Sequence, residues 1–178
     1  QGFGRAQAAE AASVKSIRSA AALRSALTSS ESGAYRLSAD ISGVTKAIVV
    51  KSKTKSLDLN GYSVKGKDRT TGLITVKGGK LTISDSKGGG QIRNTDNQDA
   101  VGCESGTLII NGGSFRGAKC GVKQMKGKLK INGGSLKGED GLTLAGNTKT
   151  SVRIAGGSLR GTHNGCTASG GKLTISGG

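Results

Sequence analysis

The chain has 178 residues, the length of a single domain. Proline and tryptophan are absent and there are only two Phe and two Tyr residues, so a core built on large aromatic rings is excluded. No apolar run reaches roughly 18 residues, so the sequence predicts no membrane-spanning helix. The charge is one-sided, because 27 Lys and Arg residues against 11 Asp and Glu residues give a net charge of +16.

Residues 6–27 are the only stretch with helical periodicity. Its polar side carries Lys15, Arg18 and Arg24, and its apolar residues recur near the spacing of one helix face. These apolar residues are Ala8, Ala11, Ala12, Val14, Ile17, Ala21, Leu23 and Leu27. We therefore expect residues 1–30 to form an N-terminal tail and an α-helix that caps the following domain, since the open end of a repeat domain exposes strand edges.

Residues 107–178 repeat one pattern: a short apolar strand, a Gly-Gly corner, a second short strand and another Gly. Aligning the copies gives three apolar columns. The first, at the leading position of an L-x-I strand, is Leu81, Leu108, Leu129, Val152 and Leu173, with Leu57 and Leu59 as an earlier copy. The second, after the corner, is Val64, Ile92, Phe115, Leu136 and Leu159. The third, before the L-x-I strand, is Leu73, Val101, Val122, Leu142 and Cys166.

These columns predict a solenoid. Period-two spacing points both apolar side chains of each L-x-I strand to one face. Three inward columns in every 21 to 27 residues describe a coil with three short strands per turn. A leucine-rich repeat needs a longer motif, a propeller blade needs about 40 to 45 residues, and a sandwich would not keep one register across the copies. The pattern therefore favours an all-β, single-stranded parallel β-helix of about six turns over residues 31–178.

Three motifs near the start of this region carry a family resemblance. They are S-A-L-T-S at the end of the expected helix, Y-R-L-S-A-D-I at 35–41 and L-D-L-N-G-Y-S-V at 57–64. In this order they resemble the opening of right-handed parallel β-helix proteins of the pectate-lyase-like superfamily, and the resemblance extends from about residue 15 to residue 178. It implies a right-handed coil. It says little about function, because that architecture carries lyases, hydrolases, phage tailspikes, adhesins and inert surface proteins.

Part of the basic excess is ordered. Each copy places a basic residue directly after the inward residue of the post-corner strand; these are Lys65, Arg93, Arg116, Lys137 and Arg160. In a solenoid they form one outward column at a spacing of about 4.8 Å. Stacked like charges repel by about 0.8 kcal/mol per neighbouring pair in water, before salt screening.

A column that keeps this repulsion indicates an anionic partner: an acidic polysaccharide, a lipid headgroup, an acidic protein face or, less favoured because aromatic stacking platforms are missing, a nucleic acid. The alternative is a solvated face that keeps sheets from associating.

Related enzymes that cut acidic polysaccharides use clustered Asp residues, or Asp-bound calcium with a basic residue. The register of this chain brings one such constellation together, Asp99 and Asp140 with Glu139 and His163, the sole histidine. Asp99 and Asp140 are then two turns apart, roughly 9 to 10 Å, which suits an inverting carboxylate pair. Corner positions favour Asp and Asn for backbone reasons, however, so we expect no catalytic residue and keep these four as candidates only.

The three cysteines give no framework for cross-linking. Cys103 and Cys166 fall at inward positions and Cys120 falls at a corner, so none stacks directly on another. We expect free thiols that act as small apolar residues. No C-x-x-C spacing and no histidine partner supports a metal site, and we expect neither a metal nor a cofactor.

The sequence thus favours a non-catalytic structural protein, extracellular or at the cell surface, that binds an anionic partner through the basic column. The chain stops at Ile-Ser-Gly-Gly, within a repeat and without a C-terminal cap. We expect this end either to continue into further chain or to stack on another subunit, extending to end-to-end filaments. The competing class is a polysaccharide lyase or glycoside hydrolase of the pectate-lyase-like type, or a fragment of one.

Overall fold

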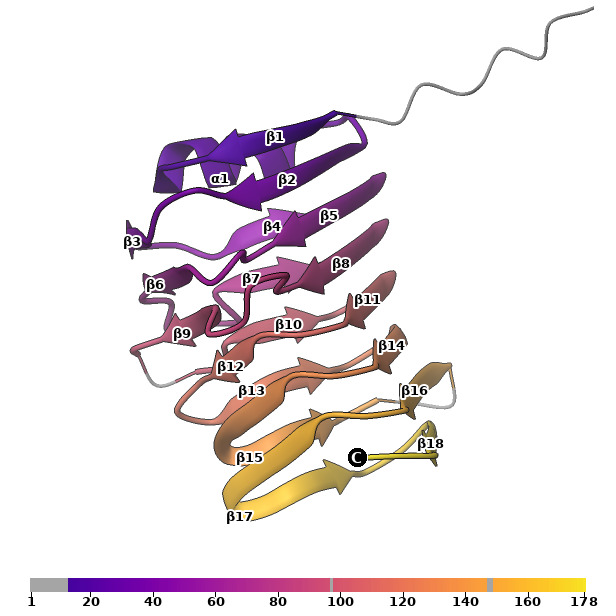
Figure 1. The fold of residues 1–178 in the computed structure, drawn as a ribbon. Helices are drawn as coiled ribbons and strands as arrows, with labels where there is room; N and C mark the ends of the chain where they lie inside the picture. Colours follow the sequence, from indigo (N-terminus) through magenta and orange to yellow (C-terminus); the bar gives the residue numbers. More distant parts are fainter. Residues whose placement is uncertain (1–12, 97, 147–148) are drawn as a thin grey trace, which may run out of the picture.

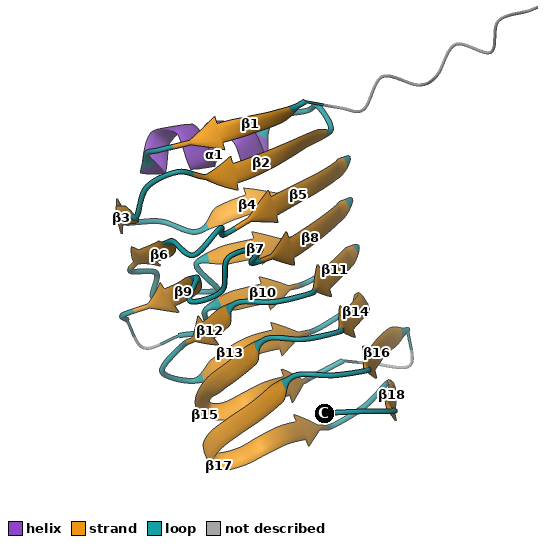
Figure 2. Cartoon of the chain, viewed as in Figure 1, coloured by secondary structure: helices purple, strands orange, loops and turns teal. Residues whose placement is uncertain are grey.

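The structure, a computed structural model, describes residues 13–96, 98–146 and 149–178. The chain forms a parallel β-solenoid of about seven turns with one α-helix, which confirms the predicted fold class (Figures 1 and 2). The repeat predicts about six turns. The difference lies at the N-terminal end, where the strands Val14–Ile17 and Gly33–Leu37 lack both the L-x-I motif and the Gly-Gly corner.

Eight strands form one face of the solenoid, and every strand pair is parallel. In spatial order they are β1 (Val14–Ile17), β2 (Gly33–Leu37), β5 (Thr54–Asp58), β8 (Lys80–Ser84), β11 (Thr107–Ile110), β14 (Gly127–Ile131), β16 (Thr150–Ile154) and β18 (Lys172–Ile175). One strand per turn enters this sheet, so neighbours in the sheet are one full turn apart in the sequence.

The ten remaining strands form a folded sheet that covers the other two faces. The second face contains β3 (Ile41–Val44), β6 (Ser63–Gly66), β9 (Gln91–Asn94), β12 (Ser114–Arg116) and the first halves of β15 (Ser135–Leu144) and β17 (Ser158–Ala168). The third face contains the second halves of β15 and β17 beside β4 (Ile48–Val50), β7 (Ile74–Val76), β10 (Val101–Cys103) and β13 (Cys120–Gln124). Because β15 and β17 run through the corner, they join the two faces.

The predicted apolar columns form the core from the turn of β8 onward. Residues of the leading and post-corner columns are successive register partners up the stack. Phe115, for example, lies between Ile92 and Leu136, and all three side chains are fully buried. The core is therefore mainly a stack of Leu, Ile and Val, in which Phe115 is the aromatic ring of the described central turns and Tyr35 lies near the N-terminal end.

Two column assignments are wrong near the N-terminal end. In the third column the residue opposite Val101 is Ile74, not Leu73, which precedes the strand and is also buried. In the first column Leu57 pairs with Ile83, so the leading position of β5 belongs to Lys55. Both errors arise where two register choices place apolar residues inward, because the apolar pattern alone does not separate them.

Lys55 is fully buried at this leucine position. Its ammonium group donates hydrogen bonds to the hydroxyl of Ser29 at 3.0 Å, to the Ser29 carbonyl at 2.9 Å and to the carbonyl of Glu31. Burial lowers the pKa of Lys55, and the negative charge of Glu31 acts in the opposite direction. The bonded carbonyls directly follow the C-terminus of the helix, where a positive charge is favoured, so Lys55 ties the helix to the solenoid.

The predicted helix is much shorter than expected. It is α1 (Ala20–Thr28), while Val14–Ile17 is strand β1 of the eight-stranded sheet, and the expected helical residues 6–12 lie outside the described part. The Ser19 side chain ends the strand and caps the helix by accepting a hydrogen bond from the N–H of Ala22 at 3.1 Å. Three buried residues of α1 join the end of the core beneath β1 (Figure 1), namely Leu23, Ala26 and Leu27.

Asp58 joins three turns through its carboxylate. It accepts hydrogen bonds from Arg36 Nε at 2.9 Å, from the Asn60 N–H at 2.9 Å, and from the N–H and hydroxyl of Ser86 at 2.9 and 2.7 Å. Burial alone would raise the pKa of Asp58, but the Ser86, Asn60 and Arg36 hydrogen bonds outweigh it and hold the pKa below 3.8. The charged form is therefore part of the folded state.

This arrangement predicts an acid-sensitive fold. The pKa of Asp58 is lower in the folded chain than in the unfolded chain, where it is about 3.9. The ionised carboxylate therefore stabilises the fold fully above the unfolded pKa, and this stabilisation is lost as the pH falls through the folded pKa. We expect Tm to decrease as the pH falls from 5 to 2.5, and Asp58→Asn to flatten that decrease. The matched control is Glu139→Gln at an exposed position. Identical pH profiles for the wild type and Asp58→Asn would contradict this role.

Candidate functional site: a basic groove along the solenoid

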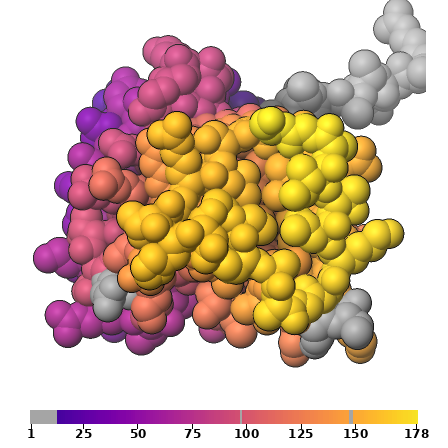
Figure 3. All heavy atoms as spheres, turned by 90° about the horizontal axis from the view of Figure 1, so that it is seen from below, coloured from indigo at the N-terminus to yellow at the C-terminus, as the bar shows by residue number. Residues whose placement is uncertain are grey.

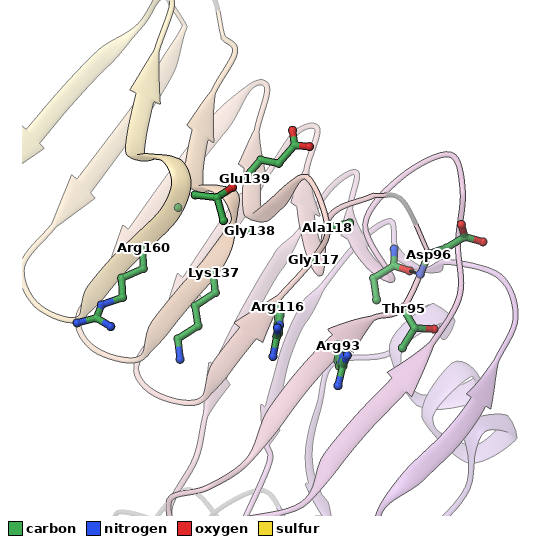
Figure 4. A pocket seen from close by; sticks show the side chains of 13 residues that line it. Arg93, Thr95, Asp96, Arg116, Gly117, Ala118, Lys137, Gly138, Glu139 and Arg160 are labelled. Carbon is green, nitrogen blue, oxygen red and sulfur yellow. Dashed lines mark hydrogen bonds between the residues drawn. The ribbon is translucent and has the colours of Figure 1, made fainter.

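A groove of about 580 Å³ runs along the solenoid where four stacked strands turn toward the third face (Figure 4). It is lined by residues 93–96, 116–118, 137–139 and 160–162. These segments belong to β9, β12, β15 and β17 and to the residues that follow them, one segment from each successive turn. The groove therefore runs from turn to turn, and a linear ligand lying in it would contact four turns.

One wall of the groove is a column of basic side chains, called here the basic ladder: Lys65, Arg93, Arg116, Lys137 and Arg160. The sheet register pairs each member with the next, so the structure stacks them in the predicted order. The last four line the groove and point the same way in Figure 4, whereas Lys65 lies beyond its end, near Asp40.

The backbone period dictates the direction of the ladder side chains. Phe115 and Leu136 occupy the preceding positions on β12 and β15 and are fully buried, so Arg116 and Lys137 must point outward. The buried column thus fixes the outward column. A ladder position tolerates changes of side chain without loss of core contacts.

The facing wall of the groove carries polar and acidic groups. Glu139 is exposed, and Asp96 accepts a hydrogen bond from Arg69 Nε at 3.0 Å. Figure 4 shows both carboxylates on the side away from the ladder cations. Thr95 and Thr162 also line the groove, and the Thr95 hydroxyl donates a hydrogen bond to the Gly66 carbonyl at 3.1 Å. The groove therefore offers positive charge on one side and hydrogen-bond acceptors on the other.

The corner beside the groove requires glycine. A Cβ on Gly117 would collide with the carbonyl oxygen of Cys120, and a Cβ on Gly161 would collide with that of Asn164. The chain therefore comes very close to itself directly after the ladder residue of each of these turns.

The four ladder cations that line the groove form no ion pair with the described residues. Among the residues that the structure describes, ion pairs within 4.0 Å join Arg36 to Asp58, Arg69 to Asp96, and Lys77 to Glu104. None of these pairs involves a ladder residue. A row of unpaired cations spaced by about 4.8 Å attracts a partner with regularly spaced negative groups.

The four candidate catalytic residues do not converge on the groove. Glu139 lines it, but Asp99 lines a separate cavity of about 70 Å³, far below the roughly 300 Å³ of a typical ligand pocket. Asp99 is only 4 % exposed, and its Oδ1 has no hydrogen-bond partner in the described part of the chain. Burial raises the pKa of Asp99, against the opposing effects of its hydrogen bond with Cys120 and the charge of Lys123.

Hydrogen bonds from neighbouring side chains hold the Asp140 carboxylate in place. The carboxylate accepts hydrogen bonds from the hydroxyls of Thr143 and Thr167, each at 3.2 Å, and from Asn164 Nδ2 at 3.0 Å. Burial acts to raise the pKa of Asp140, but the hydrogen bonds from Asn164, Thr167 and Thr143, together with the charge of His163, give a net lowering. A carboxylate held ionised in this way suits a corner anchor better than a proton donor.

The cysteines are three free thiols in the structure. Burial raises the pKa of Cys103 to about 11 and that of Cys120 to about 12, so neither forms a reactive thiolate near neutral pH. Within the described ranges no group of three or more His, Cys, Asp or Glu side chains is placed to hold a metal ion. No helix in the same ranges has the length and apolarity needed to span a membrane.

Sequence reasoning missed the facing wall. The signal was present in the short motifs R-G-A, K-G-E and R-G-T at 116–118, 137–139 and 160–162, where a Gly and then the wall residue follow the ladder residue, whereas Arg93 is followed by Asn94. The identity of the wall residue changes from turn to turn, so it formed no column. Only the folded corner shows that these residues face the ladder.

No protein-family model, curated protein or solved structure matches this chain. The fold and the groove define a parallel β-solenoid with a basic groove along the stack of turns.

Proposed function

We propose that this protein is a non-catalytic binding module that holds a linear anionic polymer in the basic groove. The observation that carries the proposal is the ladder of four groove-lining cations, presented by four successive turns and without ion pairs to the described part of the chain. A polymer in the groove contacts every rung at once. Several weak ion pairs, each worth about 0.2 to 1 kcal/mol at an exposed site, then add to a useful affinity.

The facing wall favours an acidic polysaccharide over a nucleic acid. Glu139 and Asp96 repel a polymer that is negative on all sides, whereas their oxygens accept hydrogen bonds from sugar hydroxyls. No aromatic residue lines the groove, so the stacking platforms that hold single-stranded nucleic acids are missing there. An acidic sugar chain supplies both an anionic edge and a hydroxyl edge.

Binding is favoured over cleavage because the candidate carboxylates are poorly placed for chemistry. Asp99 is buried outside the groove, and Asp140 is held by three side-chain hydrogen bonds. Glu139 is the single carboxylate among the four candidates that lines the groove, and the other groove-lining carboxylate, Asp96, is paired with Arg69 at 3.0 Å, whereas glycoside hydrolysis needs two carboxyl groups of which one donates a proton. The competing proposal is a polysaccharide lyase or glycoside hydrolase of the pectate-lyase-like type. Under either function, we propose that the solenoid belongs to the pectate-lyase-like superfamily.

Calorimetric titration with polygalacturonate, dextran sulfate, neutral dextran and single-stranded poly-dT tests the proposal. We expect the two acidic polysaccharides to bind, with an affinity that falls as the salt concentration rises, and neutral dextran not to bind. Incubation should release no new reducing ends and no unsaturated products. Turnover that Asp99→Ala with Asp140→Ala abolishes would replace the binding module by the enzyme, and tighter binding of poly-dT would overturn the polysaccharide assignment.

Self-association at an extracellular or cell-surface location completes the proposal. In the described structure β18 is the last strand of its sheet, and Ile175 is 64 % exposed on the turn that forms the end surface in Figure 3. A strand at a sheet edge with an exposed apolar residue is suited to pairing with another subunit. Light scattering at low and high protein concentration tests this part: growth into oligomers or fibres is expected, and a monomer at all concentrations would refute it.

A further inference from the structure

The outer face of the eight-stranded sheet carries a second group of basic side chains, separate from the basic ladder. Its members, called here the outer patch, are Lys128, Lys130, Arg153 and Lys172, from β14, β16 and β18, and all four are exposed. The residues that alternate with them on these strands belong to the inward Leu, Ile and Val columns. The strand period therefore holds all four cations on the same outer face.

The register brings the four cations close together. Lys130 is the direct partner of Arg153, and Lys128 and Lys172 both pair with Ser151, one from each side. Neighbouring members are therefore about 5 to 10 Å apart. This is close to the Debye length of about 8 Å at physiological ionic strength, so the four charges act on a partner together.

The outer patch contains charge of one sign only. Strands β11, β14, β16 and β18 contain no Asp or Glu, and no patch residue has a carboxylate within 4.0 Å among residues 13–96, 98–146 and 149–178. The other half of the same sheet differs, because there Arg36 pairs with Asp58 at 2.9 Å. A face that serves solubility alone mixes both signs, as that half does.

The shape of this face separates it from the groove. None of the residues that line the two cavities belongs to β11, β14, β16 or β18, and these strands stack side by side as one sheet (Figure 1). A linear polymer on such a face would lack walls. A planar partner with dense negative charge reaches all four cations at the same time.

We propose that the outer patch docks the protein on the surface of an anionic lipid bilayer. Binding is peripheral, through lipid headgroups, and it leaves the basic groove on another face free for its polymer. Each cation near such a surface contributes about a fivefold gain in partitioning, so the four together give a gain on the order of several hundredfold.

Sedimentation with phosphatidylcholine vesicles, with and without 30 % phosphatidylserine, tests the proposal on the whole chain. The test variant is Lys128→Thr with Lys130→Thr and Arg153→Thr; neighbouring strands carry Thr in the same columns, at Thr107 and Thr174, so the sheet accepts them. The control variant loses the same charge from the ladder: Arg93→Gln, Arg116→Gln and Lys137→Gln. Circular dichroism verifies that both variants keep the β-fold.

We expect the wild type to bind only the vesicles with phosphatidylserine, the outer-patch variant to lose about 100-fold in partitioning, and the ladder variant to lose less than about fivefold. Equal losses in the two variants would show that net charge alone governs binding and would overturn the proposal. So would failure of the wild type to bind. Loss of polygalacturonate binding in the outer-patch variant, with vesicle binding retained, would make the face a polysaccharide site instead.

Discussion

We expect the binding of an acidic polysaccharide to weaken about 100-fold when Arg93, Arg116 and Lys137 are all replaced by Gln. Each cation lines the groove and has no ion pair within residues 13–96, 98–146 and 149–178, so each is available to pair with the polymer. Exposed pairs contribute up to about 1 kcal/mol, and three of them give about 3 kcal/mol, or two orders of magnitude in Kd. Titration calorimetry with polygalacturonate at low and physiological salt measures the change.

The control for this experiment keeps the net charge equal. The outer-patch variant, Lys128→Thr with Lys130→Thr and Arg153→Thr, also removes three positive charges, but from another face. We expect it to change Kd for polygalacturonate by less than about fivefold, through long-range charge alone. Comparable losses in the two variants would mean that the groove is not the binding site.

Phe115→Ala should produce the largest loss of stability of any single core substitution. Phe115 is the one aromatic ring among the fully buried side chains and lies between Ile92 and Leu136 in the middle of the stack. Its removal leaves a cavity bounded by the neighbouring turns, which do not collapse without breaking the register. We expect the free energy of unfolding to fall by about 3 to 5 kcal/mol, measured by urea denaturation.

Phe115→Leu provides the comparison, because leucine is the residue of the same column in the next turn. A loss of about 1 to 2 kcal/mol is expected for this smaller change of volume. If Phe115→Ala lost less than 1 kcal/mol, the inward column would not be the stabilising element that the structure indicates.

The sequence predicts the solenoid well because the same physical constraint acts on every turn. An inward position in a parallel stack favours an apolar side chain that packs on the ones above and below it, so Leu108, Leu129 and Val152 recur as register partners from turn to turn. The pattern weakens where a different interaction replaces apolar stacking. Lys55 is buried by hydrogen bonds to Ser29 and Glu31, and an apolar pattern does not reveal a buried cation.

The helix and the groove show two further limits. Val14 and Ile17 fit a helix face by spacing, yet they lie on a strand because pairing with β2 adds a full ladder of backbone hydrogen bonds. The ladder wall of the groove was predictable from period and spacing, since its residues recur in one column. The facing wall was not predictable from the sequence, because Glu139 and Asp96 come from corners whose sequences differ. Only the folded chain places these two residues along one groove.

Chemical footprinting of arginine tests directly whether the acidic polymer lies in the basic groove. Phenylglyoxal labelling and mass spectrometry, with and without saturating polygalacturonate, report which guanidinium groups the polymer covers. We predict protection of Arg93, Arg116 and Arg160 in the groove, and unchanged labelling of Arg69 and Arg153 outside it. Protection centred on Arg153, or spread evenly over all five, would contradict the assignment of the groove as the polymer-binding site.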